Sequence, residues 1–133
     1  LELVNLVGAN PVEMEAERHD HLVAGISHLP YLLSSALVRT IDAEAQQDPT
    51  IWALAASGFR DTSRLAGSDI RMMTDIISTN GTAIARLLAL FRIQLATLEA
   101  ALIADDDRQL KAMLQTAHDA RQIWETHYQR RKP

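Results

Sequence analysis

The hydrophobic positions of the chain repeat at helical spacing over most of its length. From Glu15 to Ala45, apolar residues recur at steps of three and four, which places them on one face of a helix. Pro30 lies inside this pattern and has no backbone N–H to donate, so we expect one long helix with a kink near residues 26–30. The apolar stripe consists of Leu22, Ile26, Leu29, Leu33, Leu37 and Ile41.

Further helices are predicted by start and stop signals downstream. Asp48 followed by Pro49 is typical of a helix start, and Ser57-Gly58 is expected to end that short helix. Residues 58–67 are expected to be irregular or a single helical turn. Ser68-Asp69 is expected to open the next helix, with Ser68 as its cap residue. The predicted later helices cover 49–56, 68–79, 82–104 and, after the run of aspartates at 105–107, a last helix to about residue 130.

The first fourteen residues differ from the rest. Leu1 to Val7 has helical spacing that Gly8 ends, and residues 11–14 read as a short extended piece. They are interpreted as the last helix and strand of a preceding α/β domain, and the leucine at position 1 favours an internal fragment. Elsewhere no strand-like alternation occurs. The predicted class is all-α, a bundle of about five to six helices with a long kinked first helix, and the wide stripes favour a helical dimer.

The composition of the chain argues against several classes of function. The chain has 133 residues, is 47% hydrophobic and carries a formal net charge of -4, which argues against nucleic acid as a partner. It has no cysteine, so neither a disulfide nor a thiolate metal site is expected, and a cytoplasmic location is the default. Arg86, Arg92 and Glu99 interrupt the most apolar stretch, which argues against a membrane span. His19, His21 and His28 lack the spacing of a metal site.

Two motifs resemble a known family. Residues 19–31 read HDHLVAGISHLPY, and residues 58–69 read GFRDTSRLAGSD, with Asp75-Ile76 and Asn80 following. In order and spacing they resemble prephenate and arogenate dehydrogenases over about sixty residues. The helix pattern is similar over nearly the whole chain. The resemblance implies NAD(P)-dependent oxidative decarboxylation in tyrosine biosynthesis, in which a ring hydride goes to the nicotinamide and carbon dioxide is lost.

The same resemblance implies that two domains have different roles. Residues 1–14 would be the C-terminal remnant of a Rossmann-type nucleotide-binding domain, and residues 15–133 a helical domain that forms a homodimer and closes over prephenate or arogenate. NAD or NADP would be bound mainly by the N-terminal domain, because this chain has no glycine-rich phosphate loop. The histidine that accepts the substrate proton belongs to that domain too. No catalytic or cofactor-binding residue is therefore expected here, and the fragment alone should be inactive.

The resemblance implies that Arg64 binds a substrate carboxylate, for which a guanidinium offers two parallel hydrogen bonds. The alternative for Arg64 is a surface ion pair with Asp61, three residues earlier. Asp61 itself is expected to orient Arg64 or an arginine of the partner chain. Ser27 matches a position that lines the substrate site. Tyr31, four residues on, stands where the family usually has histidine, so it donates a hydrogen bond without positive charge.

Two more residues complete the predicted substrate site. Ser68 is expected to cap a helix and to lie near the pocket. Met73 stands where many relatives carry tryptophan, and it fills either the same apolar wall or ordinary core. His19 and His28 are interpreted as site residues or as structural histidines that order the helix.

Two alternatives stay open: a non-catalytic helical interaction module, and the C-terminal domain of another two-domain NAD(P)-dependent hydroxy-acid dehydrogenase. The sequence does not choose prephenate over arogenate or NAD over NADP, and it does not decide feedback inhibition by tyrosine.

Overall fold

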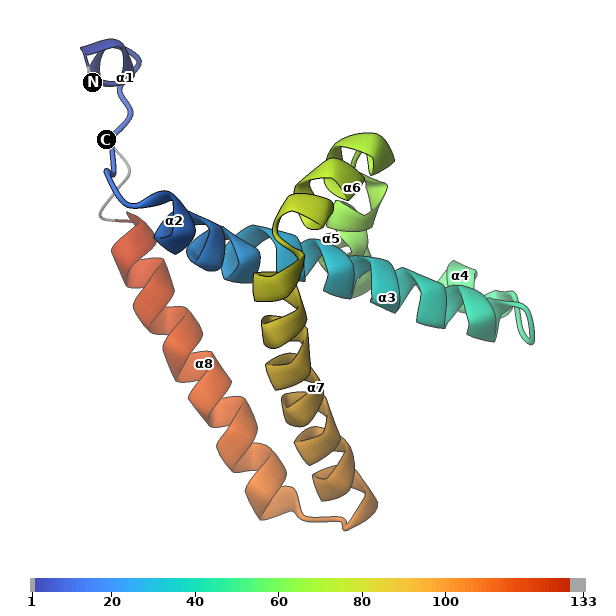
Figure 1. The fold of residues 1–133 in the computed structure, drawn as a ribbon. Helices are drawn as coiled ribbons and strands as arrows, with labels where there is room; N and C mark the ends of the chain where they lie inside the picture. The colour runs from blue at the N-terminus through green and yellow to red at the C-terminus, as the bar shows by residue number, and fades with distance from the viewer. Residues whose placement is uncertain (1, 130–133) are drawn as a thin grey trace. The chain divides into compact units, whose positions relative to one another are not determined.

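The computed structural model describes residues 2–129, and all regular structure in that range is helical (Figure 1). The all-α prediction is confirmed. The chain divides into two compact units, residues 1–88 and 89–133, and helix α7 contributes to both. The elements are α1 (Glu2–Leu6), α2 (Ala16–Val23), η1 (Ala24–His28), α3 (Leu29–Ala45), α4 (Thr50–Leu54), α5 (Ser57–Ser63), η2 (Arg64–Gly67), α6 (Ile70–Thr79), α7 (Gly81–Ile103) and α8 (Asp107–Gln129).

The long first helix is formed by α2, η1 and α3 in direct succession, as predicted. Its middle segment, η1, is a π-helix, in which the Leu29 N–H donates to the Ala24 carbonyl five residues back. Pro30 follows in the first turn of α3 and cannot donate a backbone hydrogen bond. A π-turn holds one residue more than an α-turn and often marks a functional site. The predicted kink therefore takes the form of a π-helical turn just before the proline.

The same 30-residue helix, Ala16–Ala45, is long and apolar enough to cross a membrane by length and composition. Core helices of soluble proteins pass the same test, so this property assigns no membrane location. The predicted absence of a membrane partner stays a prediction.

The segment after the long helix departs from expectation. Asp48 does cap α4, since its Oδ1 accepts a hydrogen bond from the Thr50 backbone N–H at 2.9 Å. Hydrogen bonds from the Thr50 side chain and backbone lower the pKa of the Asp48 carboxyl below its ordinary value. Ser57-Gly58, however, does not end a helix but begins α5, which continues into η2. The expectation that residues 58–67 would be irregular or a single helical turn is wrong, because α5 and η2 together cover residues 57–67.

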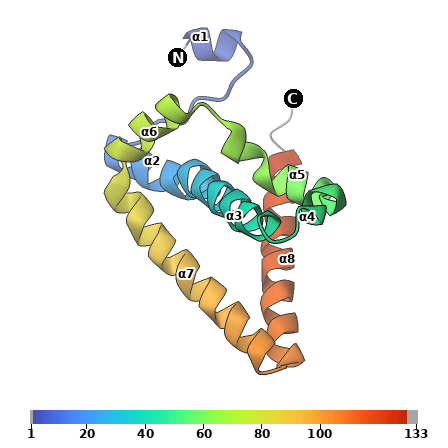
Figure 2. The same cartoon turned by 90° about the vertical axis from the view of Figure 1, so that its right-hand side faces the viewer.

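Tertiary packing explains this helical segment. The Trp52 and Phe59 rings meet edge to face with centroids 5.6 Å apart and join α4 to α5. Both helices and η2 lie against α3 (Figures 1 and 2). Packing of this kind outweighs the weak helix preference of glycine and serine.

The start of α6 corrects the predicted role of Ser68. The Oδ1 atom of Asp69 accepts a hydrogen bond from the Met72 N–H at 2.7 Å, so Asp69 is the N-cap. Ser68 lies one residue outside the cap position because the carboxylate of Asp69 already satisfies that donor. Helix α6 ends at Thr79, as predicted, and α7 begins at Gly81, one residue before its predicted start.

In the second unit, the part of α7 from residue 89 onward connects to α8 at residues 104–106. Asp105 has a positive φ of 48°, and Asp106 Oδ1 accepts from the Gln109 N–H at 2.9 Å, so the aspartate run ends one helix and caps the next as predicted. The two helices diverge from this connection (Figure 1). Between them lies a groove of about 430 Å³. Helix α8 is described as far as Gln129, and its predicted end near residue 130 lies outside the described residues.

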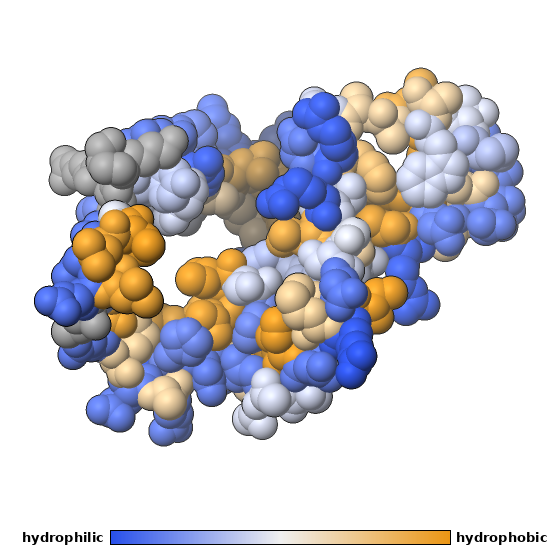
Figure 3. Space-filling model, turned by 90° about the horizontal axis from the view of Figure 1, so that it is seen from above, coloured by the Kyte–Doolittle hydropathy of each residue, from blue (hydrophilic) through white to orange (hydrophobic). Residues whose placement is uncertain are grey.

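Few side chains are buried in the single chain. Most of the buried apolar side chains among the described residues are small. They are Ala24, Ala45, Met73, Ile84 and Ala101. Many large apolar side chains are open to solvent instead, and Figure 3 shows hydrophobic groups at several places on one face, among hydrophilic ones. An isolated chain with so much exposed apolar surface is typical of a domain that needs a partner surface.

Candidate functional site

The two sequence motifs lie side by side in the first unit. Ser34 of α3 is 2% exposed, and its Oγ accepts a hydrogen bond from the Ala66 backbone N–H at 2.9 Å. Ala66 belongs to η2, which begins with Arg64, and Ser34 follows Tyr31 by one turn of α3. This hydrogen bond therefore attaches the turn that carries the second motif to the helix that carries the first. Ser34 had no predicted role, because only the fold shows that it is buried next to η2.

Arg64 lies exposed at the first position of η2 and makes no hydrogen bond or ion pair among the described residues. Asp61 pairs with Arg60 instead, with 2.9 Å between Arg60 Nε and Asp61 Oδ1. The alternative ion pair between Arg64 and Asp61 is thus absent from this structure, because the adjacent Arg60 already occupies the carboxylate. Both members of the Arg60–Asp61 pair are largely exposed, so the pair itself contributes little stability. The donors of the Arg64 guanidinium have no partner among the described residues.

The other predicted site residues differ in exposure. Ser27 is exposed in the π-helical turn, and Tyr31 is half-buried in the first turn of α3. Ser68 is half-buried between η2 and α6. Met73 is buried within α6, at 7% exposure. The π-turn and α3 thus present a serine hydroxyl and a phenol on consecutive turns of one helix.

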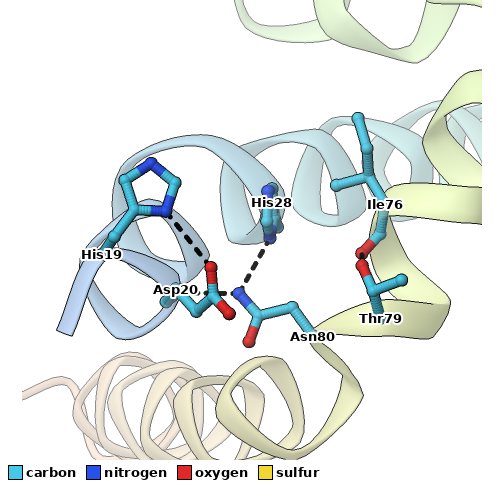
Figure 4. A network of polar contacts seen from close by, with 6 residues as sticks. All are labelled: His19, Asp20, His28, Ile76, Thr79 and Asn80. Carbon is cyan, nitrogen blue, oxygen red and sulfur yellow. Dashed lines mark hydrogen bonds and ion pairs between the residues drawn. The ribbon is translucent and has the colours of Figure 1, made fainter. Parts of the chain in front are cut away.

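A polar network lies beside the π-turn (Figure 4). The Asn80 Nδ2 atom, between α6 and α7, donates to the Asp20 carbonyl at 2.6 Å and lies 3.4 Å from His28 Nδ1. His28 is 8% exposed. His19 Nδ1 lies 3.1 Å from Asp20 Oδ1 on the exposed side of α2, which agrees with its interpretation as a residue that orders this end of the helix. Asn80 belongs to the second motif, but spacing alone gives no sign of its contacts.

Next to this network is an open cavity of about 540 Å³ that combines charges of both signs with polar groups. Its lining residues are Glu17, Asp20, His21, Asn80, Thr82, Ala83 and Arg86. The three histidines of the first helix do not converge with carboxylates on a shared point, and residues 2–129 contain no group of three potential metal ligands.

Replacement of Ser34 by alanine is expected to destabilise the domain by about 1–3 kcal/mol, because it leaves the part-buried Ala66 N–H without an acceptor. Ser35→Ala is the matched control. The Ser35 hydroxyl bonds only to the Tyr31 carbonyl within the same helix, at 3.0 Å, so its loss should be close to neutral. Urea denaturation of both variants measures the difference. Equal stabilities for the two variants would show that the hydrogen bond between α3 and η2 contributes nothing.

Two solved dehydrogenases contain a region with this fold. The arogenate dehydrogenase of Synechocystis superposes with a TM-score of 0.77 at 29% identity, over 92% of this chain and 45% of that one. The prephenate dehydrogenase from A. aeolicus, solved in complex with hydroxyphenyl propionate and NAD+, gives a TM-score of 0.79 at 27% identity, over 91% of this chain and 44% of that one. In both cases the likeness spans the greater part of this chain and less than half of the enzyme.

The sequence comparisons identify the family. The model of the prephenate dehydrogenase dimerization domain matches residues 15–116, and the chain belongs to this family. The prephenate dehydrogenase of Lactococcus lactis subsp. cremoris is 29% identical over 126 residues, which are 95% of this chain and 36% of the relative. The family that the two motifs resemble is confirmed, and another type of hydroxy-acid dehydrogenase is set aside.

Proposed function

We propose that this chain is the helical dimerisation and substrate-closing domain of an enzyme that carries out the NAD(P)-dependent oxidative decarboxylation of prephenate or arogenate. The observation that carries the proposal is the family match over residues 15–116. It is supported by the unpaired Arg64 guanidinium in a turn attached to the helix of Ser27 and Tyr31. The proposed location is the cytoplasm, and the proposed role is in tyrosine biosynthesis.

The protein has to hold a small cyclic anion in one orientation. In the proposed site the Arg64 guanidinium binds a substrate carboxylate through two parallel hydrogen bonds. Ser27 and Tyr31 donate hydroxyl hydrogen bonds from the bent helix, while Ser68 and Met73 lie at the rim and the apolar wall. We assign Asp61 to the edge of the site, where it orients an arginine of the partner subunit. Tyr31 gives the site one positive charge fewer than a protonated histidine would, which favours a substrate with less negative charge at that end.

The nicotinamide cofactor supplies the redox chemistry, since it accepts the ring hydride. The five glycines of this chain lie singly, and none belongs to a glycine-rich phosphate loop. We therefore assign NAD or NADP to a preceding nucleotide-binding domain, of which residues 1–14 are the end. The apolar side chains of this segment support that assignment, because the other described residues leave them largely exposed to solvent. These side chains are Leu3, Leu6, Val7 and Val12. Helix α1 ends at Leu6, and the turn that follows it reaches Gly8, whose φ is 73°.

The proposed assembly is a homodimer formed through the long helices. The groove between α7 and α8 supports it, because the groove is lined mainly by apolar and small side chains. A helix from a second subunit would bury these side chains and supply the core that the single chain lacks. The lining residues are Gln94, Leu98, Met113, Leu114, Thr116, Ala117 and Ala120.

The test of the proposed function is an assay of the full-length protein with prephenate and arogenate, each with NAD+ and NADP+. Reduced cofactor and carbon dioxide should form in equal amounts with at least one combination, and residues 1–133 alone should show no turnover. A folded full-length protein inactive with all four combinations would contradict the proposal and favour a non-catalytic interaction module.

A further inference from the structure

Asn80 contacts the long first helix on both sides of its π-turn (Figure 4). Its Nδ2 atom donates to the carbonyl of Asp20, in the α-helical part before the turn, and approaches Nδ1 of His28, the last residue of the turn. Asp20 and His28 are eight residues apart, while Asn80 is far from both in the sequence. One side chain thus connects the two ends of the irregular segment to the start of α7.

The Asp20 carbonyl determines which way the Asn80 amide faces. If the amide were turned over, its oxygen would lie 2.6 Å from another oxygen that can only accept hydrogen bonds. The NH₂ group must therefore face Asp20, and the same nitrogen lies 3.4 Å from His28 Nδ1. Since an amide nitrogen only donates, His28 Nδ1 must be the acceptor. An Nδ1 atom that accepts carries no proton, so this contact corresponds to the tautomer with its proton on Nε2.

We propose that Asn80 is a positioning residue for the substrate site. It holds His28 in the Nε2–H tautomer and fixes the π-turn that presents Ser27 to the ligand. This inference rests on the proposed function, because Ser27 matters only if the helix face binds substrate. Asn80 itself touches no proposed substrate contact, and it acts through the backbone of η1.

The packing of the turn against α7 is apolar. On the α7 side, Leu87 Cδ1 comes within 3.7 Å of the position that a Cβ on Gly25 would occupy, and Ala24 is fully buried. These contacts are apolar, and apolar contacts are not directional. Hydrogen bonds are directional, so the Asn80 amide fixes the rotation that decides where Ser27 points.

The first measurement is the tautomer of His28 in the full-length enzyme, observed by long-range ¹H–¹⁵N NMR and assigned by comparison with His28→Gln. The wild-type protein should show a proton on Nε2 and none on Nδ1. In Asn80→Asp, the carboxylate can only accept, so the proton should appear on Nδ1. A wild-type imidazole with its proton on Nδ1 would overturn the proposal, whether or not any variant folds.

The second measurement is the steady-state kinetics of the same proteins. Asn80→Ala and Asn80→Asp should raise KM for the preferred substrate about tenfold while kcat stays within about threefold, the split expected when binding geometry is lost. Thr79→Ala is the matched control. The Thr79 hydroxyl bonds only to the Ile76 carbonyl of its own helix at 2.8 Å, so the control should match wild type.

The outcomes separate this inference from the proposed function. If the Asn80 variants fold and keep the wild-type KM, the positioning role is wrong even though the enzyme is a dehydrogenase. If the wild type turns over neither substrate, the proposed function fails, while the tautomer measurement still decides the link between Asn80 and His28.

Discussion

Replacement of Arg64 by alanine in the full-length enzyme should raise KM for prephenate or arogenate by about two orders of magnitude. Two hydrogen bonds to a carboxylate contribute about 1.5–3 kcal/mol each, so loss of about 3 kcal/mol corresponds to a factor of about 150. The turnover number should change much less, because the guanidinium binds a part of the substrate that does not react. Arg64→Lys should recover only a fraction of the affinity, since an ammonium cannot form two parallel hydrogen bonds.

Arg60→Ala is the matched control for this experiment. Arg60 is an arginine four residues earlier in the same motif, but its guanidinium is engaged by Asp61 at the surface. Its removal should change KM by no more than about fivefold, because exposed ion pairs contribute about 0–1 kcal/mol. Equal effects of the two substitutions would mean that the region responds to loss of positive charge in general, and Arg64 would lose its assigned role.

The second large effect is expected at the groove between α7 and α8. Ala117→Glu combined with Ala120→Glu should convert the proposed dimer to a monomer. Both alanines line the groove, and a glutamate there would place an unpaired charge where a partner helix needs an apolar surface. An uncompensated buried charge costs about 3–5 kcal/mol, and a twofold interface repeats the change in both subunits, so dissociation should increase by at least about a thousandfold. Light scattering at tens of micromolar measures the mass.

Ala112→Glu makes the same chemical change on α8 at an exposed position that does not line the groove. This control should remain dimeric. A wild-type protein that is a stable monomer at tens of micromolar would contradict the dimer proposal directly, and a double variant that stays dimeric would move the interface to another surface.

The parts of the fold that depend on local chemistry were predictable. Asp48 accepts the Thr50 N–H, and the long helix bends where Pro30 removes a donor. These features depend on only a few neighbouring residues, so a short stretch of sequence is enough to predict them. The form of the bend was not predictable, because a proline is compatible with several kinds of distortion.

The remaining differences come from contacts between distant segments. Residues 57–67 are helical because Phe59 packs on Trp52 and Ala66 bonds to Ser34, which no local pattern reveals. Among neighbouring charges, the choice of Arg60 over Arg64 as the partner of Asp61 depends on side-chain rotamers. The motif residues of the candidate site could be predicted from the sequence. The contacts of Ser34 and Asn80 join segments far apart in the chain, so only the structure reveals them.

The most direct test of the account is a crystal structure of the full-length protein with NAD+ and hydroxyphenyl propionate, the ligand pair of the A. aeolicus enzyme. The account predicts that the Arg64 guanidinium forms two hydrogen bonds with the ligand carboxylate, and that the Ser27 hydroxyl lies within contact of the same ligand. An Arg64 side chain directed into bulk water, with the carboxylate bound by other residues, would contradict it.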